Sequence, residues 1–297
     1  MRRSEAKPNR AAVEAPDVRR SEAKPNRAAV EAHGLSLVED FRRDGAVPIR
    51  GLLSSSQVET LRQGIDRNRA DPGPLAQGHG ADRSFFEDFC NWERIDEYEE
   101  VIRDAALGEL AAELMGSETA RLFHDHVLVK EAGSAEPSPW HQDQPYYCVD
   151  GKQNVSFWIP VDPVSRENTL KFVAGSQAPG TWYMPRTFLT QTALVFDEGE
   201  LEEVPDVDAD RSAHQILGWE LEPGDAVAFH MLTLHQAGGS PTLRRAFSVR
   251  VLGDDARYAP RPHPTSPPFP GLDDELEAGD PFDSPRFPLL QPNAGGP

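Results

Sequence analysis

The sequence predicts a mainly β protein: an antiparallel β barrel or jelly roll flanked by helices. In the first part of the globular region, apolar side chains recur with the 3.6-residue spacing of amphipathic helices. Beyond Ser117 the spacing changes to period 2, in short runs separated by Gly, Pro or acidic residues. Helices followed by many short strands with turns between them favour a jelly roll with helices on one side.

We expect the 297 residues to form one folded domain with a tail at each end. Residues 2–15 recur letter for letter as residues 19–32. Two identical copies are too few to stack as a solenoid and lack large apolar side chains, so residues 1–33 should be a disordered tail. The domain should span residues 34–255, and a Pro-rich extension over 256–297 should lie on the surface as extended coil.

The helical part is expected over residues 35–116 and the β core over residues 117–253. Ser36 with Glu39 and the serines from Ser54 provide helix-capping signals. The expected elements before the β core are, in order, a helix from Ser36, an edge strand over 46–49, a helix after Ser54, a loop over 71–80 and two helices within 92–115.

Within the β core, the stretch 122–130 alternates in polarity. Regular alternation places Phe123, Val127 and Val129 on one face, and Leu122, His124, His126 and Leu128 on the other. The further strand-like runs are 153–160, 169–173, 192–196, 214–221, 225–235 and 244–252. The segment 197–210 has eight acidic residues and no aromatic one, which predicts a solvated loop, with an active-site lid as the alternative.

Charge and composition narrow the function classes. Residues 1–32 carry eight Lys or Arg and five Asp or Glu, so the rest carries 22 against 44, a net charge of −22. Such a body repels phosphate backbones and anionic membranes, so we expect neither nucleic acid nor membrane as partner. Because the chain lacks a signal-peptide-like apolar stretch and has only Cys90 and Cys148, we expect a soluble cytoplasmic protein with buried thiols. Oligomeric state is not indicated.

The most informative stretch is Trp140-His141-Gln142-Asp143 with the residues that follow it to Tyr147. On an extended segment the side chains of His141 and Asp143 point to the same face, so they can share a metal ion. Two imidazoles and one carboxylate on one face are typical of ferrous iron sites that leave positions open for a co-substrate and O₂. The alternative is a loop His and a loop Asp that are two residues apart by chance.

A second imidazole must come from further along the chain, and His235 is the preferred candidate. It ends an apolar run just before the turn at residues 238–241, which leads directly into the strand that begins with Arg244. His230 is an odd number of residues away, so on a regular strand it points to the opposite face. The other competitors are His214, His124 and His126, of which His124 or His126 is expected to line the cavity.

The strand over 244–252 offers a guanidinium close to this site. Period 2 places Arg244 with Ala246, Ser248 and Arg250, and Arg245 with Phe247, Val249 and Val251. Small side chains beside Arg244 leave room for a ligand whose carboxylate the planar guanidinium can bind. The alternative is a solvent-facing strand with Arg for solubility.

Together these motifs resemble the phytanoyl-CoA dioxygenase family of iron(II)/2-oxoglutarate-dependent oxygenases, from about Phe41 to Leu252. In the family's order the motifs are His141-Gln142-Asp143, Phe157-Trp158-Ile159-Pro160, Gly175-Ser176-Gln177, residues 224–230 through His235, and Arg244-Arg245-Ala246. The resemblance implies a double-stranded β-helix core, a cupin-like jelly roll. It also implies Fe²⁺ held by His141, Asp143 and His235, with 2-oxoglutarate and O₂ as co-substrates.

The resemblance further implies that Arg244 holds the distal carboxylate of 2-oxoglutarate, with Arg245 as the alternative, and that Lys130 and Trp158 line the co-substrate pocket. The implied reaction hydroxylates an unactivated C–H bond of a small-molecule metabolite and releases succinate and CO₂. In halogenating relatives chloride takes the coordination position that Asp143 occupies here, so hydroxylation or a related oxidation is favoured.

The substrate is less well indicated. Gln142, Gln144, Tyr146 and Tyr147 flank the ligands and are candidates to face it, with packing at a strand end as the alternative. The acidic body favours a small neutral or cationic metabolite over a CoA ester. Two rival functions are a zinc-dependent hydrolase, which would not need Arg244, and a non-catalytic jelly-roll binding module.

Overall fold

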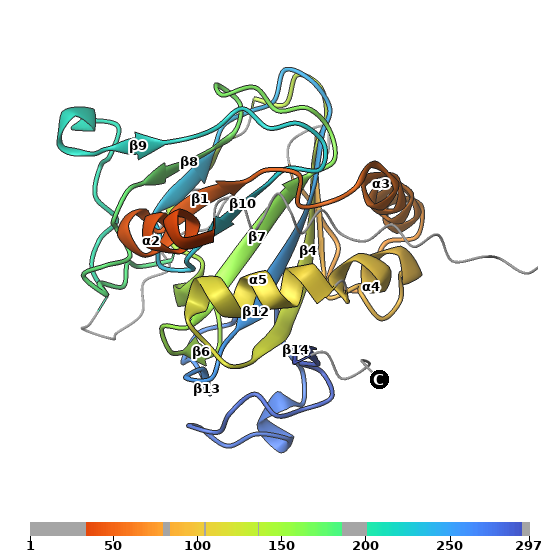
Figure 1. Ribbon diagram of the computed structural model, residues 1–297, viewed down its shortest axis with the longest axis vertical. Coiled ribbons are helices and arrows are strands. Elements are labelled where there is room, and N and C mark those ends of the chain that lie inside the picture. Colours follow the sequence, from red (N-terminus) through yellow and green to blue (C-terminus); the bar gives the residue numbers. More distant parts are fainter. Residues whose placement is uncertain (1–33, 80–83, 104, 136, 186–200, 293–297) are drawn as a thin grey trace, which may run out of the picture.

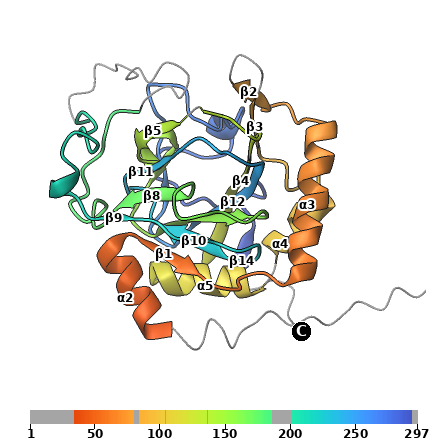
Figure 2. The same ribbon diagram turned by 90° about the horizontal axis from the view of Figure 1, so that it is seen from above.

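The computed structural model describes residues 34–79, 84–103, 105–135, 137–185 and 201–292. Two facing antiparallel sheets form its body (Figures 1 and 2). The larger has the strand order β1-β10-β7-β12-β4-β3-β2, with β14 also pairing with β4, and the smaller has the order β5-β11-β8-β9. This is the jelly roll of a double-stranded β-helix, so the predicted fold class is confirmed. The duplicated segment lies outside the described residues.

The elements have the following bounds. The α-helices are α2 (Gly34–Asp44), α3 (Ser55–Ala70), α4 (Asp96–Ile102) and α5 (Ala105–Met115), and the 3-10 turns are η1 (Gln144–Tyr146), η2 (Arg211–Ala213) and η3 (Leu272–Asp274). The strands are β1 (Ala46–Ile49), β2 (Gln77–His79), β3 (Phe85–Phe89), β4 (Ala120–Lys130), β5 (Ser138–His141), β6 (Val149–Asp150), β7 (Asn154–Pro160), β8 (Leu170–Val173), β9 (Ile216–Leu217), β10 (Ala226–Phe229), β11 (His235–Ala237), β12 (Arg244–Leu252), β13 (Arg257–Tyr258) and β14 (Leu289–Gln291).

The helices follow the predicted order and cover the outer face of the larger sheet (Figure 2). Ser54 caps α3: its side chain accepts from the Gln57 amide while the Gln57 side chain accepts from the Ser54 amide. Helix α2 begins at Gly34, so the predicted cap Ser36 lies inside its first turn instead. The predicted loop over 71–80 contains the short strand β2. The helices bury their apolar faces against β4, β7 and β12.

Strand β4 departs from the predicted regular alternation. Phe123 is skipped in the ladder with β12, where the register shifts, so β4 contains a β-bulge at this point. An extra residue reverses the faces on either side of it. Leu122 therefore packs with Val127 and Val129 beneath the helices, whereas Phe123 packs in a separate cluster with aromatic residues of the C-terminal segment.

Two other predicted strands are shorter than expected. The run 225–235 is divided into β10 and β11 by a turn, and the run 214–221 contains only β9. The run 192–196 and the start of the acidic segment lie outside the described residues. In the described part of that segment Val204 and Val207 are buried, and Asp208 accepts a hydrogen bond from the Trp140 indole at 3.1 Å. Residues 201–210 are therefore not simply a solvated loop.

The C-terminal segment differs from the expected surface coil. Strand β13 pairs with β6, and β14 pairs with β4. Between them Phe282 and Phe287 are almost fully buried and pack on Phe123. The apolar side chains between the prolines supply a core that the proline count alone does not reveal. Among the described residues, no helix is both long and apolar enough to cross a lipid bilayer.

Candidate active site

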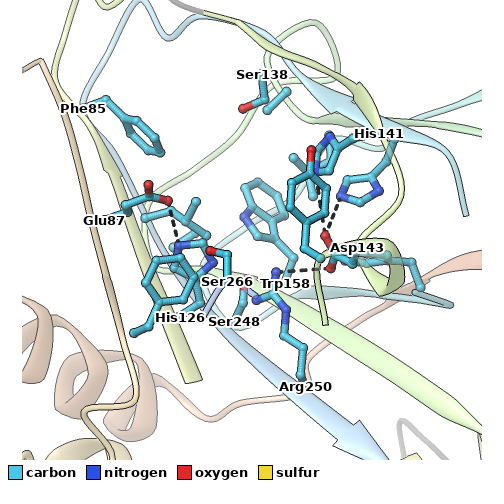
Figure 3. Close-up of a pocket in the computed structure, with 18 of the residues that line it drawn as sticks. Phe85, Glu87, His126, Ser138, His141, Asp143, Trp158, Ser248, Arg250 and Ser266 are labelled. Carbon is cyan, nitrogen blue, oxygen red and sulfur yellow. Dashed lines mark hydrogen bonds and ion pairs between the residues drawn. The ribbon is translucent and has the colours of Figure 1, made fainter. Parts of the chain in front are cut away.

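The side chains of His141, Asp143 and His235 meet inside the jelly roll. Figure 3 shows His141 beside Asp143 at one side of the cavity. His141 ends β5 and His235 begins β11, and the ladder pairs these two residues directly. Asp143 follows in the turn after β5, where its amide donates to the Met231 carbonyl at 2.8 Å. The Asp143 Oδ1 atom lies 3.7 Å from His141 Nε2 and 3.5 Å from His235 Nε2. These separations allow one ion to contact all three side chains.

Both imidazoles are in the state that a metal ligand needs. Nδ1 of His141 lies 2.8 Å from the Pro139 carbonyl and Nδ1 of His235 lies 2.9 Å from the Thr233 carbonyl. A carbonyl accepts a proton, so each Nδ1 carries the hydrogen and each Nε2 presents a lone pair toward Asp143. Burial, reinforced by His235, lowers the pKa of His141 to about 3, and burial also lowers the pKa of His235. Both rings are therefore neutral at pH 7.

Asp143 is held ionised in this buried position. Burial acts to raise its pKa, but the positive charge of the Arg250 guanidinium opposes this effect, and the pKa lies below its usual range. Arg250 Nη2 and Ser156 Oγ each donate to Oδ2 at 3.3 Å, which leaves Oδ1 toward the imidazoles. Two neutral nitrogens and one carboxylate oxygen, all buried, form a donor set that fits Fe²⁺.

A cavity that opens to solvent lies between these residues and the larger sheet, and its empty space, counted together with the solvent-filled mouth, is about 880 Å³. The cavity floor is formed by inward-facing side chains of the paired strands β7, β12, β4 and β3. Three rows of paired residues cross it: Arg244, Lys130 and Phe85; Ala246, Leu128 and Glu87; and Trp158, Ser248, His126 and Phe89. Residues far apart in the sequence are thus neighbours because they share a row.

The two adjacent arginines point to opposite faces, as alternation predicts. Arg244 lines the cavity, is 6% exposed, and lies 5.9 Å from the centroid of the Trp158 ring. Its guanidinium donates to the Asn168 carbonyl. Burial lowers the Arg244 pKa to about 10, so it is still charged at pH 7. Arg245 instead pairs with Asp162 at 2.8 Å on the outer face. Lys130 also lines the cavity and donates to the Gly238 carbonyl at 3.0 Å.

The four residues that flank the ligands separate into two pairs. Tyr146 and Tyr147 line the cavity. Gln142 does not: its amide donates to the Thr181 and Leu232 carbonyls and accepts from the Tyr183 amide. The Gln144 amide likewise donates to the Gly151 carbonyl at 2.8 Å and accepts from Asn154. The two glutamines hold the ligand-bearing segment in place instead of facing a substrate.

The competing histidines also separate. His126 is among the cavity-lining residues, whereas His124, His214 and His230 are not. The His230 ring accepts from the Leu232 amide and lies 2.9 Å from the Lys152 carbonyl, outside the site. His230 was expected to point away because of strand parity, but the reason is the turn that separates β10 from β11.

Several cavity residues were not predicted. Phe85, Glu87 and Phe89 come from β3, and Ser266 comes from the C-terminal segment. Residues 85–89 are Phe-Phe-Glu-Asp-Phe and do not alternate in polarity, so no local pattern indicated a strand with one inward face. Arg250 was placed on the inward face of β12, but its contact with Asp143 depends on a turn that the sequence did not locate.

A jelly roll with two buried neutral imidazoles, an ionised carboxylate and a buried guanidinium on the facing sheet defines the class of iron(II)/2-oxoglutarate-dependent oxygenases. The sequence profile of the phytanoyl-CoA dioxygenase family matches residues 41–246, and the chain belongs to this family. Fe²⁺, 2-oxoglutarate and O₂ are accordingly its cofactor and co-substrates. The zinc hydrolase and the non-catalytic binding module are set aside.

Solved structures share the fold. The non-heme α-ketoglutarate-dependent epimerase SnoN from nogalamycin biosynthesis has a TM-score of 0.69 at 23% identity, covering 90% of this chain and 100% of SnoN. The carbocyclase SnoK from the same biosynthesis has a TM-score of 0.67 at 23% identity, covering 88% and 98%. EctD from S. alaskensis, solved with 2-oxoglutarate and 5-hydroxyectoine, has a TM-score of 0.61 at 18% identity, covering 83% and 84%. A search of curated proteins found no match.

Proposed function

We propose that this enzyme hydroxylates an unactivated C–H bond of a small-molecule metabolite, with His141, Asp143 and His235 as the iron ligands. The observation that carries the proposal is the convergence of their three buried ligand atoms on one face of the cavity. When bound, iron with 2-oxoglutarate and O₂ supplies an oxidant that can remove hydrogen from such a bond, with release of succinate and CO₂.

The chain's own residues would position the reactants. Arg244, charged and buried on the sheet that faces the ligands, would bind the distal carboxylate of 2-oxoglutarate. Trp158 beside it and Lys130 one strand away would form the walls of this pocket. Arg250 and Ser156 would hold Asp143 in one orientation through Oδ2. The apolar and aromatic lining would limit the access of water to the reacting bond.

The test is succinate formation from 2-oxoglutarate with Fe²⁺ and ascorbate. Wild type should form succinate, and Asp143→Ala should not, because one of three ligands is lost. Asp150→Ala is the matched control: this exposed aspartate lies seven residues further on and pairs with Arg261. Equal succinate formation by wild type and Asp143→Ala would contradict the assignment of the ligands.

Product mass separates hydroxylation from the reactions named for two structural neighbours, epimerisation and ring closure. Hydroxylation adds one oxygen atom, epimerisation leaves the formula unchanged, and oxidative ring closure removes two hydrogens. A screen of candidate metabolites for stimulated 2-oxoglutarate turnover, read out by mass spectrometry, would identify the substrate and the outcome together.

A further inference from the structure

Strand β3 extends the larger sheet beyond β4, and its inward-facing side chains form one more part of the cavity wall. Glu87 on β3 pairs with Leu128 on β4, which in turn pairs with Ala246 on β12. Neighbouring strands lie about 4.8 Å apart, so the Glu87 backbone is about 10 Å from the strand that carries Arg244. Glu87 therefore lies two strands away from Arg244, whereas Lys130, on the strand between them, is its diagonal neighbour and has its ammonium 5.4 Å from the centroid of the Phe85 ring.

Glu87 is a buried carboxylate that faces this cavity. It is 4% exposed, and its Oε2 lies 3.0 Å from Nε2 of His126. The ring of His126 is in turn stacked on Phe89, with 3.9 Å between the ring centroids. This packing fixes the imidazole and, through it, the carboxylate. Figure 3 shows Glu87 and His126 on one side of the cavity and His141 with Asp143 on the other.

The surroundings of Glu87 combine aromatic surface with a second polar wall. Phe85 and Phe89 flank it on the inward face of β3, and Tyr146 also lines the cavity. Ser266, whose amide donates to the Tyr146 carbonyl at 2.9 Å, brings a hydroxyl from the C-terminal segment. A ligand in this part of the cavity would contact aromatic rings, the hydroxyl groups of Ser138 and Ser266, and the Glu87 carboxylate.

We propose that Glu87 binds a protonated amine of the primary substrate, while the neighbouring aromatic rings hold an apolar part of the same molecule. The inference rests on the proposed function, because it places the substrate in the cavity that the iron ligands border. A carboxylate forms its strongest hydrogen bonds with charged donors, and aromatic faces also attract cations. The net charge of −22 on residues 33–297 acts in the same direction.

In the described part of the chain, each cationic side chain that lines the cavity has a hydrogen-bond acceptor of its own. Arg244 and Lys130 share the neighbouring row, and the proposed function assigns that row to 2-oxoglutarate, which carries two negative charges. Arg250 is engaged with Asp143 at 3.3 Å. With the co-substrate bound, Glu87 is the carboxylate that the middle of the three rows, which also contains Ala246 and Leu128, presents to an incoming amine.

The experiment compares 2-phenylethylamine, a cation at pH 7, with 2-phenylethanol, its neutral analogue. Binding to the full-length protein is measured by ligand-observed NMR under anaerobic conditions, with Fe²⁺ and 2-oxoglutarate bound, and again without metal. In wild type the amine should bind at least about tenfold more tightly than the alcohol, the preference expected for one charged hydrogen bond. Glu87→Gln should abolish the preference, because it keeps the shape and removes the charge.

Glu100→Gln is the matched control, because it removes one negative charge from an exposed position on α4. It should keep the preference of wild type, which separates local recognition from the general acidic field. Thermal unfolding verifies that both variants fold. The wild-type comparison of the two probes needs no variant, so it tests the inference even where Glu87→Gln does not fold.

The inference is overturned by equal binding of the two probes, by binding of neither at millimolar concentration, or by the same loss in both variants. Tighter binding of the alcohol, weakened by Glu87→Gln, would also overturn it and assign Glu87 to a hydroxyl donor. Absence of the iron(II)–2-oxoglutarate charge-transfer absorption would contradict the proposed function instead. The measurement without metal still reports on Glu87 in that case, so the two failures are distinguishable.

Discussion

The two halves of the cavity are built from different kinds of segment. The inner half, which is proposed to bind iron and 2-oxoglutarate, takes its residues from strands of both jelly-roll sheets, with His141 on β5, His235 on β11 and Arg244 on β12. The outer half takes Glu87 from β3, the strand next to the edge strand β2 of the larger sheet, and Ser266 from the C-terminal segment. We infer that the inner half determines the reaction class and that β3 and the C-terminal segment determine which molecule reacts.

The largest effect that tests this comparison is the loss of a proposed iron ligand. His235→Ala should lower Fe²⁺ affinity by at least about a hundredfold, more than is typical for residues that only support a ligand. His230→Ala, which removes the other histidine of the same segment, should leave iron affinity within about threefold, because its ring contacts Lys152 and Leu232 outside the site. Bound iron per chain after dialysis measures both. A similar loss in the two variants would contradict the assignment.

A smaller effect is expected from the adjacent arginines. Arg244→Gln should raise the KM for 2-oxoglutarate about tenfold to a hundredfold, the cost of one charged hydrogen-bonded contact. Arg245→Gln should leave this KM nearly unchanged, because Arg245 pairs with Asp162 on the opposite face. Initial rates of succinate formation at varied 2-oxoglutarate measure both. If Arg245→Gln raised the KM and Arg244→Gln did not, the inward and outward faces of β12 would have to be exchanged.

Most residues of the inner half could be predicted, because their spacing in the sequence indicates which of them lie on the same face. Alternation correctly placed Arg244 inward and Arg245 outward. His141 and Asp143 do point to one site, but Asp143 has helical backbone angles at the start of η1, so a turn and not the expected extended segment brings it there. The resemblance to the family then ordered the distant motifs. His230 shows a limit of such reasoning, since its exclusion followed from a regular strand that is in fact interrupted by a turn.

The residues of the outer half could not be predicted, because their positions depend on pairing between strands that are far apart in the sequence. Glu87 faces the cavity only because β3 pairs with β4 across the helices α4 and α5 that separate them in sequence. The bulge at Phe123 reverses the face of Leu122, and proline content hid the core around Phe282. Nonlocal strand pairing and insertions of one residue are resolved by tertiary packing.

Within the ligand motif, Gln142 should affect stability rather than chemistry. Gln142→Ala removes three buried hydrogen bonds to backbone groups and should lower the free energy of unfolding by about 2–3 kcal/mol. Gln63→Ala, on the exposed face of α3, should change it by less than about 0.5 kcal/mol. Urea unfolding of the metal-free chain measures both. An unchanged stability in Gln142→Ala together with a changed KM for 2-oxoglutarate would move Gln142 into the cavity.

The smallest effect concerns the pH dependence of stability in the outer half. Burial lowers the pKa of His126 below 6.5, so the folded protein binds a proton there less readily than the unfolded chain. The contribution of the neutral ring is present above pH 6.5 and is lost as the pH falls. Between pH 6.5 and 5.5 the stability advantage of wild type over His126→Gln should therefore shrink by up to about 1.0 kcal/mol.

Urea unfolding of the two proteins at both pH values measures this difference, in which contributions common to both chains cancel. Asp125, whose pKa burial raises to about 6, is one such shared contribution with the opposite sign. The charges of Asp143 and Arg250 act on the pKa of His126 in opposite directions and by less than burial does, so adding Fe²⁺ should change the pH-dependent difference only slightly. A difference that disappears when iron binds would mean that the two halves of the cavity are electrostatically coupled and cannot be assigned separate roles.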